Sequence, residues 1–254
     1  MPWDPSQYLR FGAERLRPAL DLLARVPLEA PRSIADLGCG AGNVTRLLRE
    51  RWPEADLLGV DRSPEMLARA AQTLPDARWA RADLASWSPA SPVDLLFSNA
   101  TLHWLDDHSE RFARLATFVR PGGCLAVQMP ANHTEPTHTA AFAVAEEGAW
   151  RAKLAPLLRR APVHALADYH RWLSPRAKAL DLWETRYLHV LEGEDAVAQW
   201  TRGSFLIPLL DALEPAEREA FFARYAQRLR TAYPRRADGK ALLPFRRIFL
   251  VALF

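Results

Sequence analysis

The segment with the clearest potential for chemistry is Asp36-Leu-Gly-Cys-Gly-Ala-Gly42, in which three glycines alternate with other residues. It closes the short apolar run Ser33–Leu37 and precedes a segment with helical spacing. Glycines at such a place let the backbone approach a ligand closely at the carboxyl end of a strand, where doubly wound sheets bind their ligands. The spacing departs from the Gly-x-Gly-x-x-Gly fingerprint of dinucleotide binding, because the third glycine comes one residue early.

Asp36, two residues before the first of these glycines, bears on the charge of the ligand. A carboxylate there would add negative charge beside the pyrophosphate of a dinucleotide, which is unfavourable. S-adenosylmethionine has no phosphate and carries an ammonium, a carboxylate and a sulfonium group, so a nearby carboxylate is favourable. The charge therefore favours S-adenosylmethionine over NAD.

Acceptor side chains also follow the next three predicted strands. Asp61 ends the second strand, 23 residues after Gly38, where a carboxylate can accept both ribose hydroxyls. Asp83 ends the third strand, where it can reach an adenine amino group while Leu84 packs against the ring, and Asn99 ends the fourth. One such acid alone could be a solvated strand end or a helix cap. Together beside one glycine turn they indicate a nucleoside site.

The elements that would position these residues alternate between strand-like and helix-like patterns in the first half of the chain. Ser63 and Pro64 read as an N-cap followed by proline at the first helical position. Such alternation predicts βαβ crossovers and a buried, parallel, doubly wound α/β sheet of the Rossmann-like kind. The predicted strands are Ser33–Leu37, Asp56–Val60, Ala77–Ala82, Val93–Ser98 and Cys124–Met129, with helices Asn43–Trp52 and Glu65–Leu74.

In the second half of the chain this alternation stops, and most segments have the pattern of helices. We expect one domain over residues 1–254, with a cofactor-binding half at about 30–130, helical substrate-lid insertions at about 131–243 and a terminal strand at 244–254. The predicted helices are Thr137–Lys153, Ala165–Leu173, Glu194–Thr201 and Pro215–Tyr233, and the predicted strands are Thr185–Leu191 and Phe245–Phe254.

Composition narrows the class of protein. The chain has 254 residues, 49% hydrophobic and 25% charged, and a net charge of only +3 with acids and bases interspersed, which disfavours a nucleic-acid partner. No apolar run reaches the roughly 20 residues of a membrane helix. Cys39 and Cys124 form neither a disulfide framework nor a metal-ligand spacing. We therefore expect a cytoplasmic protein, with no membrane partner, that is a monomer or a weak homodimer.

At these motifs the sequence resembles the class I S-adenosylmethionine-dependent methyltransferases. The matching segments are Asp36–Gly42, Gly59–Met66, Ala82–Leu84 and Pro121–Gly123. The resemblance implies seven strands with the last antiparallel, Asp61 on the ribose, Asp83 on the adenine amine and the glycine turn on the methionyl end. The predicted cofactor-binding residues are Asp36, Gly38, Gly40, Gly42, Asp61, Arg62, Met66, Asp83, Leu84 and Asn99, with S-adenosylhomocysteine as the product.

A closer resemblance, over nearly the whole chain, is to the trans-aconitate 2-methyltransferase family. It implies methyl-ester formation on one carboxylate of a small polycarboxylate, most simply trans-aconitate. The segments that carry it are Trp3–Phe11, Ser98–Leu105, Gln128–Asn132 with Glu135–His138, Trp183–Tyr187 and Leu243–Phe249.

This reaction needs no acid–base catalysis by the protein. A carboxylate is already ionised at neutral pH, so no general base and no catalytic residue is predicted; the task is to orient the reactants. Arginine suits the non-reacting carboxylates because its fork pairs with them bidentately. The predicted substrate-binding residues are Tyr8, Arg10, His103, Trp104, Arg202 and Arg246.

Two further possibilities remain open. One is a methyltransferase acting at carbon, oxygen or nitrogen of another small molecule, and the other is a non-catalytic S-adenosylmethionine-binding protein. Asn99 is followed by Ala-Thr, not by the Pro-Pro-aromatic sequence expected for amino-group methylation of nucleobases. His133 and His138 with Glu135 lack zinc-type spacing, so no metal site is predicted.

Overall fold

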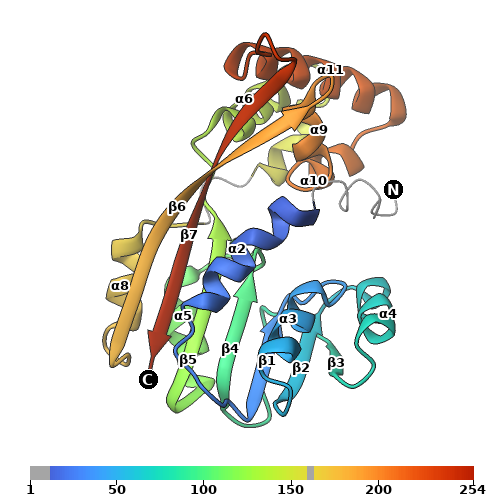
Figure 1. Ribbon diagram of the computed structural model, residues 1–254. Helices are drawn as coiled ribbons and strands as arrows, with labels where there is room; N and C mark the ends of the chain where they lie inside the picture. Colours follow the sequence, from blue (N-terminus) through green and yellow to red (C-terminus); the bar gives the residue numbers. More distant parts are fainter. Residues whose placement is uncertain (1–11, 159–162) are drawn as a thin grey trace. The chain divides into compact units, whose positions relative to one another are not determined.

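The structure, a computed structural model, describes residues 12–158 and 163–254 and contains a seven-stranded sheet (Figure 1). Its strand order is β3-β2-β1-β4-β5-β7-β6. The pairs among β1 to β5 are parallel, and β7 runs antiparallel to β5. This confirms the predicted sheet with an antiparallel last strand. The strands are β1 (Ser33–Leu37), β2 (Asp56–Asp61), β3 (Arg78–Arg81), β4 (Val93–Asn99), β5 (Val119–Pro130), β6 (Ala179–Glu192) and β7 (Lys240–Leu253).

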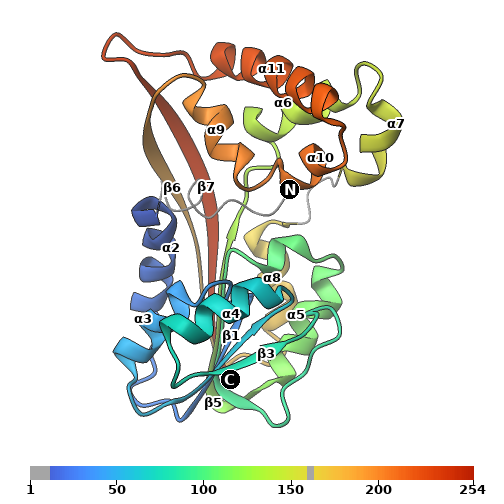
Figure 2. The same ribbon diagram turned by 90° about the vertical axis from the view of Figure 1, so that its right-hand side faces the viewer.

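Helices flank the sheet and make up most of the second half of the chain. They are α2 (Gly12–Ala24), α3 (Asn43–Arg51), α4 (Pro64–Thr73), η1 (Leu102–Trp104), α5 (His108–Thr117), α6 (Pro136–Ala145), α7 (Arg151–Leu154), η2 (Ala155–Leu157), α8 (Leu166–Leu173), α9 (Ala196–Arg202), α10 (Ile207–Asp211) and α11 (Pro215–Ala232). Helices α2 and α3 cover one face of the strands, and α5 and α8 cover the other (Figures 1 and 2). Among the described helices, none is long and apolar enough to span a membrane.

The chain divides into two compact units, each described by itself below. Of the described residues, the sheet unit comprises 15–130, 163–185 and 247–254. The helical unit comprises 12–14, 131–158 and 186–246. Strands β6 and β7 have residues in both units, whereas β1 to β5 belong to the sheet unit alone.

The core of the sheet unit lies along the central strands. Leu95, Leu96 and Phe97 of β4 are fully buried, as is the stretch from Cys124 to Val127 of β5. Strands covered by helices on both faces have no solvent side, which is why they read as continuous apolar runs in the sequence.

The helical unit has its own core, built from α6, α9 and α11. Phe221 and Tyr225 of α11 are fully buried, and Trp150 and Trp200 pack in the same cluster. The Tyr225 hydroxyl donates to the carbonyl oxygen of Thr137 at 3.0 Å, which joins α11 to α6. This buried apolar cluster holds the short helices together.

The structure corrects several predicted boundaries. The predicted helix Thr137–Lys153 is two helices, since α6 ends at Ala145 and α7 begins at Arg151. Gly148, with φ of 80°, takes the left-handed conformation that interrupts a helix. The last two strands begin earlier than predicted, β6 at Ala179 and β7 at Lys240. The sequence patterns did not indicate α2, α5 or α10.

A buried hydrogen-bond network joins α5, α8 and η1 within the sheet unit. His108 Nε2 lies 3.0 Å from the carbonyl oxygen of Leu102, and His108 Nδ1 lies 2.7 Å from the Tyr169 hydroxyl. A carbonyl only accepts, so Nε2 carries the proton, and Nδ1 accepts from Tyr169. The tyrosine oxygen accepts in turn from the His164 amide at 3.2 Å. Burial lowers the pKa of His108, which keeps the ring neutral.

Replacing Tyr169 by phenylalanine should cost about 1–3 kcal/mol of unfolding free energy, because the buried His108 Nδ1 loses its donor. Urea unfolding at neutral pH measures this loss. The exposed His170 on the same helix offers a matched control, and His170→Gln should change stability by less than about 0.5 kcal/mol. A Tyr169→Phe protein as stable as the wild type would show that the network contributes nothing.

Candidate functional site

The turn after β1 depends on glycine at three positions. Gly38, Gly40 and Gly42 have φ values of 73°, 54° and 81°, a region that L-residues rarely adopt. The amides of Gly38 and Cys39 donate to the Val60 carbonyl at 2.8 and 3.1 Å, so the turn is tied to β2. A Cβ at Gly38 would lie 2.1 Å from Thr101 Oγ1. The backbone at Gly38 therefore packs closer to Thr101 than any side chain at this position allows.

Asp61 at the end of β2 holds this turn in place. Its Oδ2 accepts from the Gly40 amide at 2.9 Å, and its Oδ1 accepts from the Ser63 amide at 2.9 Å. Ser63 then caps α4, because its hydroxyl oxygen accepts from the Met66 amide at 3.2 Å. Each carboxylate oxygen has a second lone pair. Asp61 can therefore support the turn and still accept hydroxyls from a ligand.

Asp36 lies beneath the turn and is only 1% exposed. Its Oδ2 accepts from the Thr45 hydroxyl of α3 at 2.7 Å. The pKa of Asp36 is raised to about 7, mainly by burial; the hydrogen bond from Thr45 lowers it and the charge of Asp61 raises it, both with smaller effects. A cation near the turn would stabilise the ionised form of Asp36. The pattern of residues did not indicate this contact between Asp36 and Thr45.

The remaining nucleoside candidates stand at the next strand end. The Ala82 amide donates to the Asp61 carbonyl at 3.0 Å, which brings Asp83 to the neighbouring position at the sheet edge. Asp83 is exposed, and its Oδ1 accepts from the Ala85 amide at 2.8 Å. Leu84 and Met66 are half-buried, whereas Arg62 is exposed.

Trp79 of β3 is a contact that the sequence did not indicate. A Cβ at Gly59 of β2 would lie 2.3 Å from its ring. The indole therefore packs directly on the β2 backbone. Gly59 stands in the segment that carries the family resemblance, two residues before Asp61, but the pattern did not say which side chain covers it.

The end of β4 completes this group in the sheet unit. Thr101 Oγ1 lies 3.3 Å from the Gly38 carbonyl, so the loop after β4 touches the glycine turn. Asn99 Oδ1 is buried and has no hydrogen-bond partner among the described residues. The rings of His103 and Trp104 in η1 lie 4.8 Å apart, and Trp104 is 43% exposed. All ten predicted cofactor-binding residues thus belong to the sheet unit, together with His103 and Trp104.

The predicted substrate arginines that the structure describes belong to the helical unit. Arg202 of α9 lies over the Phe222 ring at 4.8 Å and lines a cavity of about 570 Å³ against α10 and α11. Arg246 Nε donates to the Ala131 carbonyl at 2.8 Å. Tyr8 and Arg10 lie outside the described residues. Arg202 and Arg246 thus belong to a different unit from the cofactor candidates.

His133 and His138, which had raised the question of a metal, pack in an aromatic cluster of the helical unit. Their ring centroids are 5.4 Å apart, and His138 lies 3.9 Å from the ring of Phe205. Burial lowers the pKa of His138 to about 3. Glu135 lies 4.0 Å from the guanidinium of Arg186. Over residues 12–158 and 163–254, no three His, Cys, Asp or Glu side chains form a group suited to a metal ion.

The sequence matches known proteins over its whole length. Residues 34–123 match the family model described as a methyltransferase domain. A trans-aconitate 2-methyltransferase of Azoarcus sp. (strain BH72) is 48% identical, covering 99% of this chain and 98% of that protein. One of Methylobacterium nodulans is 49% identical, covering 98% of this chain and 97% of that protein.

Solved structures share the fold. The YcgJ protein from Bacillus subtilis matches with a TM-score of 0.62 at 14% identity, covering 93% of this chain and 97% of that one. A Haemonchus contortus phosphoethanolamine N-methyltransferase 2 in complex with S-adenosylhomocysteine matches with a TM-score of 0.56 at 15% identity, covering 93% of this chain and 52% of that one. At these identities the likeness concerns the arrangement of helices and strands.

Substitution of two glycines that both have left-handed backbone, Gly38 and Gly122, tests the close packing at the turn. Gly38→Ala should destabilise the protein by more than about 2 kcal/mol, because strain and overlap with Thr101 add. Gly122 has φ of 81° but open space around a Cβ, so Gly122→Ala should cost only about 1 kcal/mol of strain. Thermal unfolding of both variants measures the difference. Equal losses would contradict the close approach at Gly38.

Proposed function

The chain belongs to the trans-aconitate 2-methyltransferase family, and we propose that it transfers a methyl group from S-adenosylmethionine to one carboxylate of trans-aconitate, forming the monomethyl ester. The observation that carries this proposal is the extent of the match, 48% identity over 99% of the chain. A match restricted to residues 34–123 would indicate a methyltransferase domain alone. Here the residues outside it, those of the helical unit among them, are included in the match to the named relative.

The residues at the carboxyl ends of the strands fit this cofactor. A Cβ at Gly40 would meet nothing within 4 Å, which supports a turn whose backbone a ligand can approach. In the proposed arrangement Asp61 accepts from the ribose hydroxyls, Asp83 accepts from the adenine amine, and Leu84 packs on the base. Gly38, Gly40, Gly42 and Asp36 lie at the methionyl end, with Arg62, Met66 and Asn99 around the nucleoside. When bound, the cofactor supplies an electrophilic methyl group.

The protein's own task is to bind and orient the acid. Because the acceptor carboxylate is ionised at neutral pH, no side chain has to remove a proton. We assign His103 and Trp104, at the end of β4, to the wall of the reaction site, where they exclude water. Tyr8, Arg10, Arg202 and Arg246 remain proposed partners of the non-reacting carboxylates. No residue is assigned as a general base.

Other assignments remain predictions. These are a cytoplasmic location, a monomer or weak homodimer, and the absence of nucleic-acid and membrane partners. A methyltransferase acting on a different small molecule is the main competing function. A non-catalytic binding protein is the other.

The direct test is transfer of a labelled methyl group from S-adenosylmethionine to a panel of small acids, alcohols and amines. We expect a monomethyl ester of trans-aconitate and no turnover of neutral acceptors. At saturating S-adenosylmethionine, kcat should persist well below the ordinary imidazole pKa of about 6.5, because the nucleophile needs no base. Turnover of an amine or alcohol without turnover of any acid would refute the proposal. So would a pH profile that breaks near 6.5 together with a steep loss of kcat in His103→Ala.

Asp36 should make the affinity for S-adenosylmethionine depend on pH. With a pKa raised to about 7, Asp36 is neutral below that pH and ionised above it in the free protein. The cationic cofactor favours the ionised form, so affinity should fall as the pH drops below 7, by up to about tenfold per pH unit. Calorimetry from pH 5.5 to 8.5 measures it, with Asp36→Asn as the comparison. The same pH dependence in Asp36→Asn would assign the titration to another group.

A further inference from the structure

Two polar side chains of neighbouring strands lie on one face of the sheet unit, at the edge where the cofactor candidates stand. Gln128 of β5 is paired with Asn99 of β4 and with Phe249 of β7. Directly paired residues point to the same face, and residues two apart on one strand share a face. Arg247, two residues before Phe249, therefore faces the same side as Gln128. The sequence had not singled out either residue as a site candidate.

Both side chains are buried. Gln128 is 0% exposed and Arg247 is 5% exposed. Arg247 Nη1 donates to Gln128 Oε1 at 3.3 Å. This contact turns the amide nitrogen of Gln128 away from the guanidinium. That nitrogen, Nε2, is buried and has no hydrogen-bond partner among the described residues.

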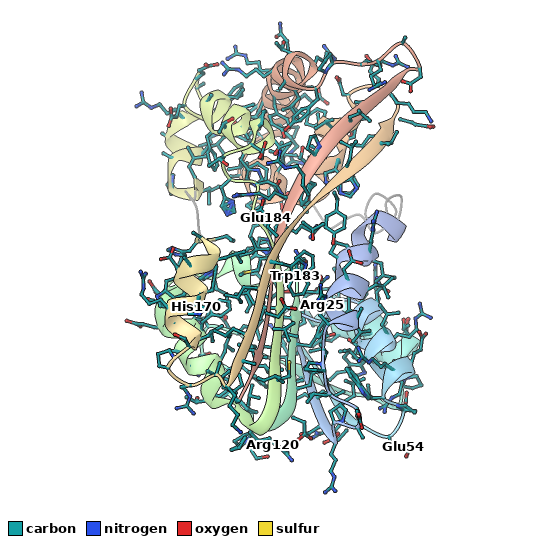
Figure 3. All side chains as sticks on the ribbon, turned by 60° about the vertical axis from the view of Figure 1, so that its left-hand side comes forward. Arg25, Glu54, Arg120, His170, Trp183 and Glu184 are labelled. Carbon is teal, nitrogen blue, oxygen red and sulfur yellow. The ribbon has the colours of Figure 1, made fainter. Side chains whose placement is uncertain are left out.

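An aromatic stack stands beside this pair. The rings of Phe249 and Trp183 lie 4.7 Å apart and nearly parallel, at 7°. The guanidinium of Arg25 lies 5.5 Å from the Trp183 ring, and Figure 3 shows the two side chains next to each other. These apolar surfaces shield the pair from water on the side of Phe249. Electrostatic attraction between a guanidinium and an anion is stronger in such a dry place than in water.

The chemistry of the pair matches a carboxylate. Burying an amide N–H without a partner is unfavourable, and a ligand oxygen that accepts a hydrogen bond from it removes this cost. Guanidinium and amide donors together fit the oxygens of a carboxylate, and a buried cation favours an anion over a neutral group. Gln128 is paired with Asn99, one of the proposed cofactor-binding residues, at the end of β4. The amide of Gln128 therefore lies beside the proposed cofactor site.

We propose that Gln128 and Arg247 bind a non-reacting carboxylate of the polycarboxylate acceptor and so select multiply charged acids. This inference rests on the proposed function. The carboxylate held here is a non-reacting one, because pairing with a guanidinium would draw charge from an attacking oxygen. A monocarboxylate has nothing to place against this pair.

Arg246, the adjacent residue, is not part of this pair. Its side chain points to the opposite face from Arg247, because successive residues of a strand alternate. Asn132 brackets its main chain, with Oδ1 accepting from the Arg246 amide at 2.8 Å and Nδ2 donating to the Arg246 carbonyl at 3.1 Å. The Asn132 side chain thereby fixes the register of this strand against the segment after β5.

The test compares Arg247→Gln and Gln128→Leu with the wild type. Leucine has nearly the volume of glutamine but donates no hydrogen bond. The measurements are the dissociation constant of trans-aconitate for the protein loaded with S-adenosylhomocysteine, KM and kcat for its methylation, and the affinity for S-adenosylhomocysteine. The matched control is Arg120→Gln, on the same strand as Gln128 but at its amino end, where Arg120 pairs with Asp94 at 3.1 Å (Figure 3).

In Arg247→Gln we expect the dissociation constant and KM for trans-aconitate to rise about 30-fold or more, the effect of removing one partner from a desolvated charge pair. Gln128→Leu should raise both about fivefold or more, the loss of a single hydrogen bond. In both, kcat and the affinity for S-adenosylhomocysteine should change less than about threefold, as should every value in Arg120→Gln.

The inference is wrong if either variant binds S-adenosylhomocysteine normally and still binds trans-aconitate as tightly as the wild type does. If Arg247→Gln does not bind S-adenosylhomocysteine, Gln128→Leu decides the question, because it removes no charge. A wild-type protein that neither binds nor methylates trans-aconitate would refute the proposed function itself. A wild type that methylates it while both variants match its KM would refute this inference alone.

Discussion

The hydrogen bond from the Gly40 amide to the Asp61 carboxylate at 2.9 Å is the contact on which the site depends. It ties a turn with three left-handed residues to the end of the neighbouring strand. The other oxygen of the same carboxylate orders the start of α4 through Ser63. One acidic side chain thus fixes the glycine backbone, the first turn of a helix and its own position at the sheet edge.

That constraint explains how charge is arranged around the turn. Asp61 is half-buried at the surface of the turn, and Asp36 lies beneath it with a raised pKa. Both favour a ligand with positive charge at this end of the sheet. On the face of the sheet shared by β5 and β7, Arg247 supplies the opposite sign. In the proposed assignment, separate groups of the sheet unit match a cationic methyl donor and an anionic acceptor.

The sequence predicted the sheet unit well because its signals are local. The glycine turn, the acids at the strand ends and the apolar strands are each visible within a few residues, and the seven-stranded sheet follows. Thr45, Trp79, Gln128 and Arg247 were missed because their roles depend on strand register and helix packing. Gln128 and Arg247 are 119 residues apart in the chain. Helix Thr137–Lys153 was wrong because one residue, Gly148, breaks it.

A crystal structure of the protein with S-adenosylhomocysteine and trans-aconitate bound would test these assignments directly. We expect the ribose hydroxyls on Asp61, the adenine amine at Asp83 and a carboxylate of the acid within hydrogen-bond distance of Arg247 and Gln128. A nucleoside bound away from the turn after β1 would contradict the cofactor assignment. An acid with every carboxylate away from Arg247 would contradict the assignment of the acceptor.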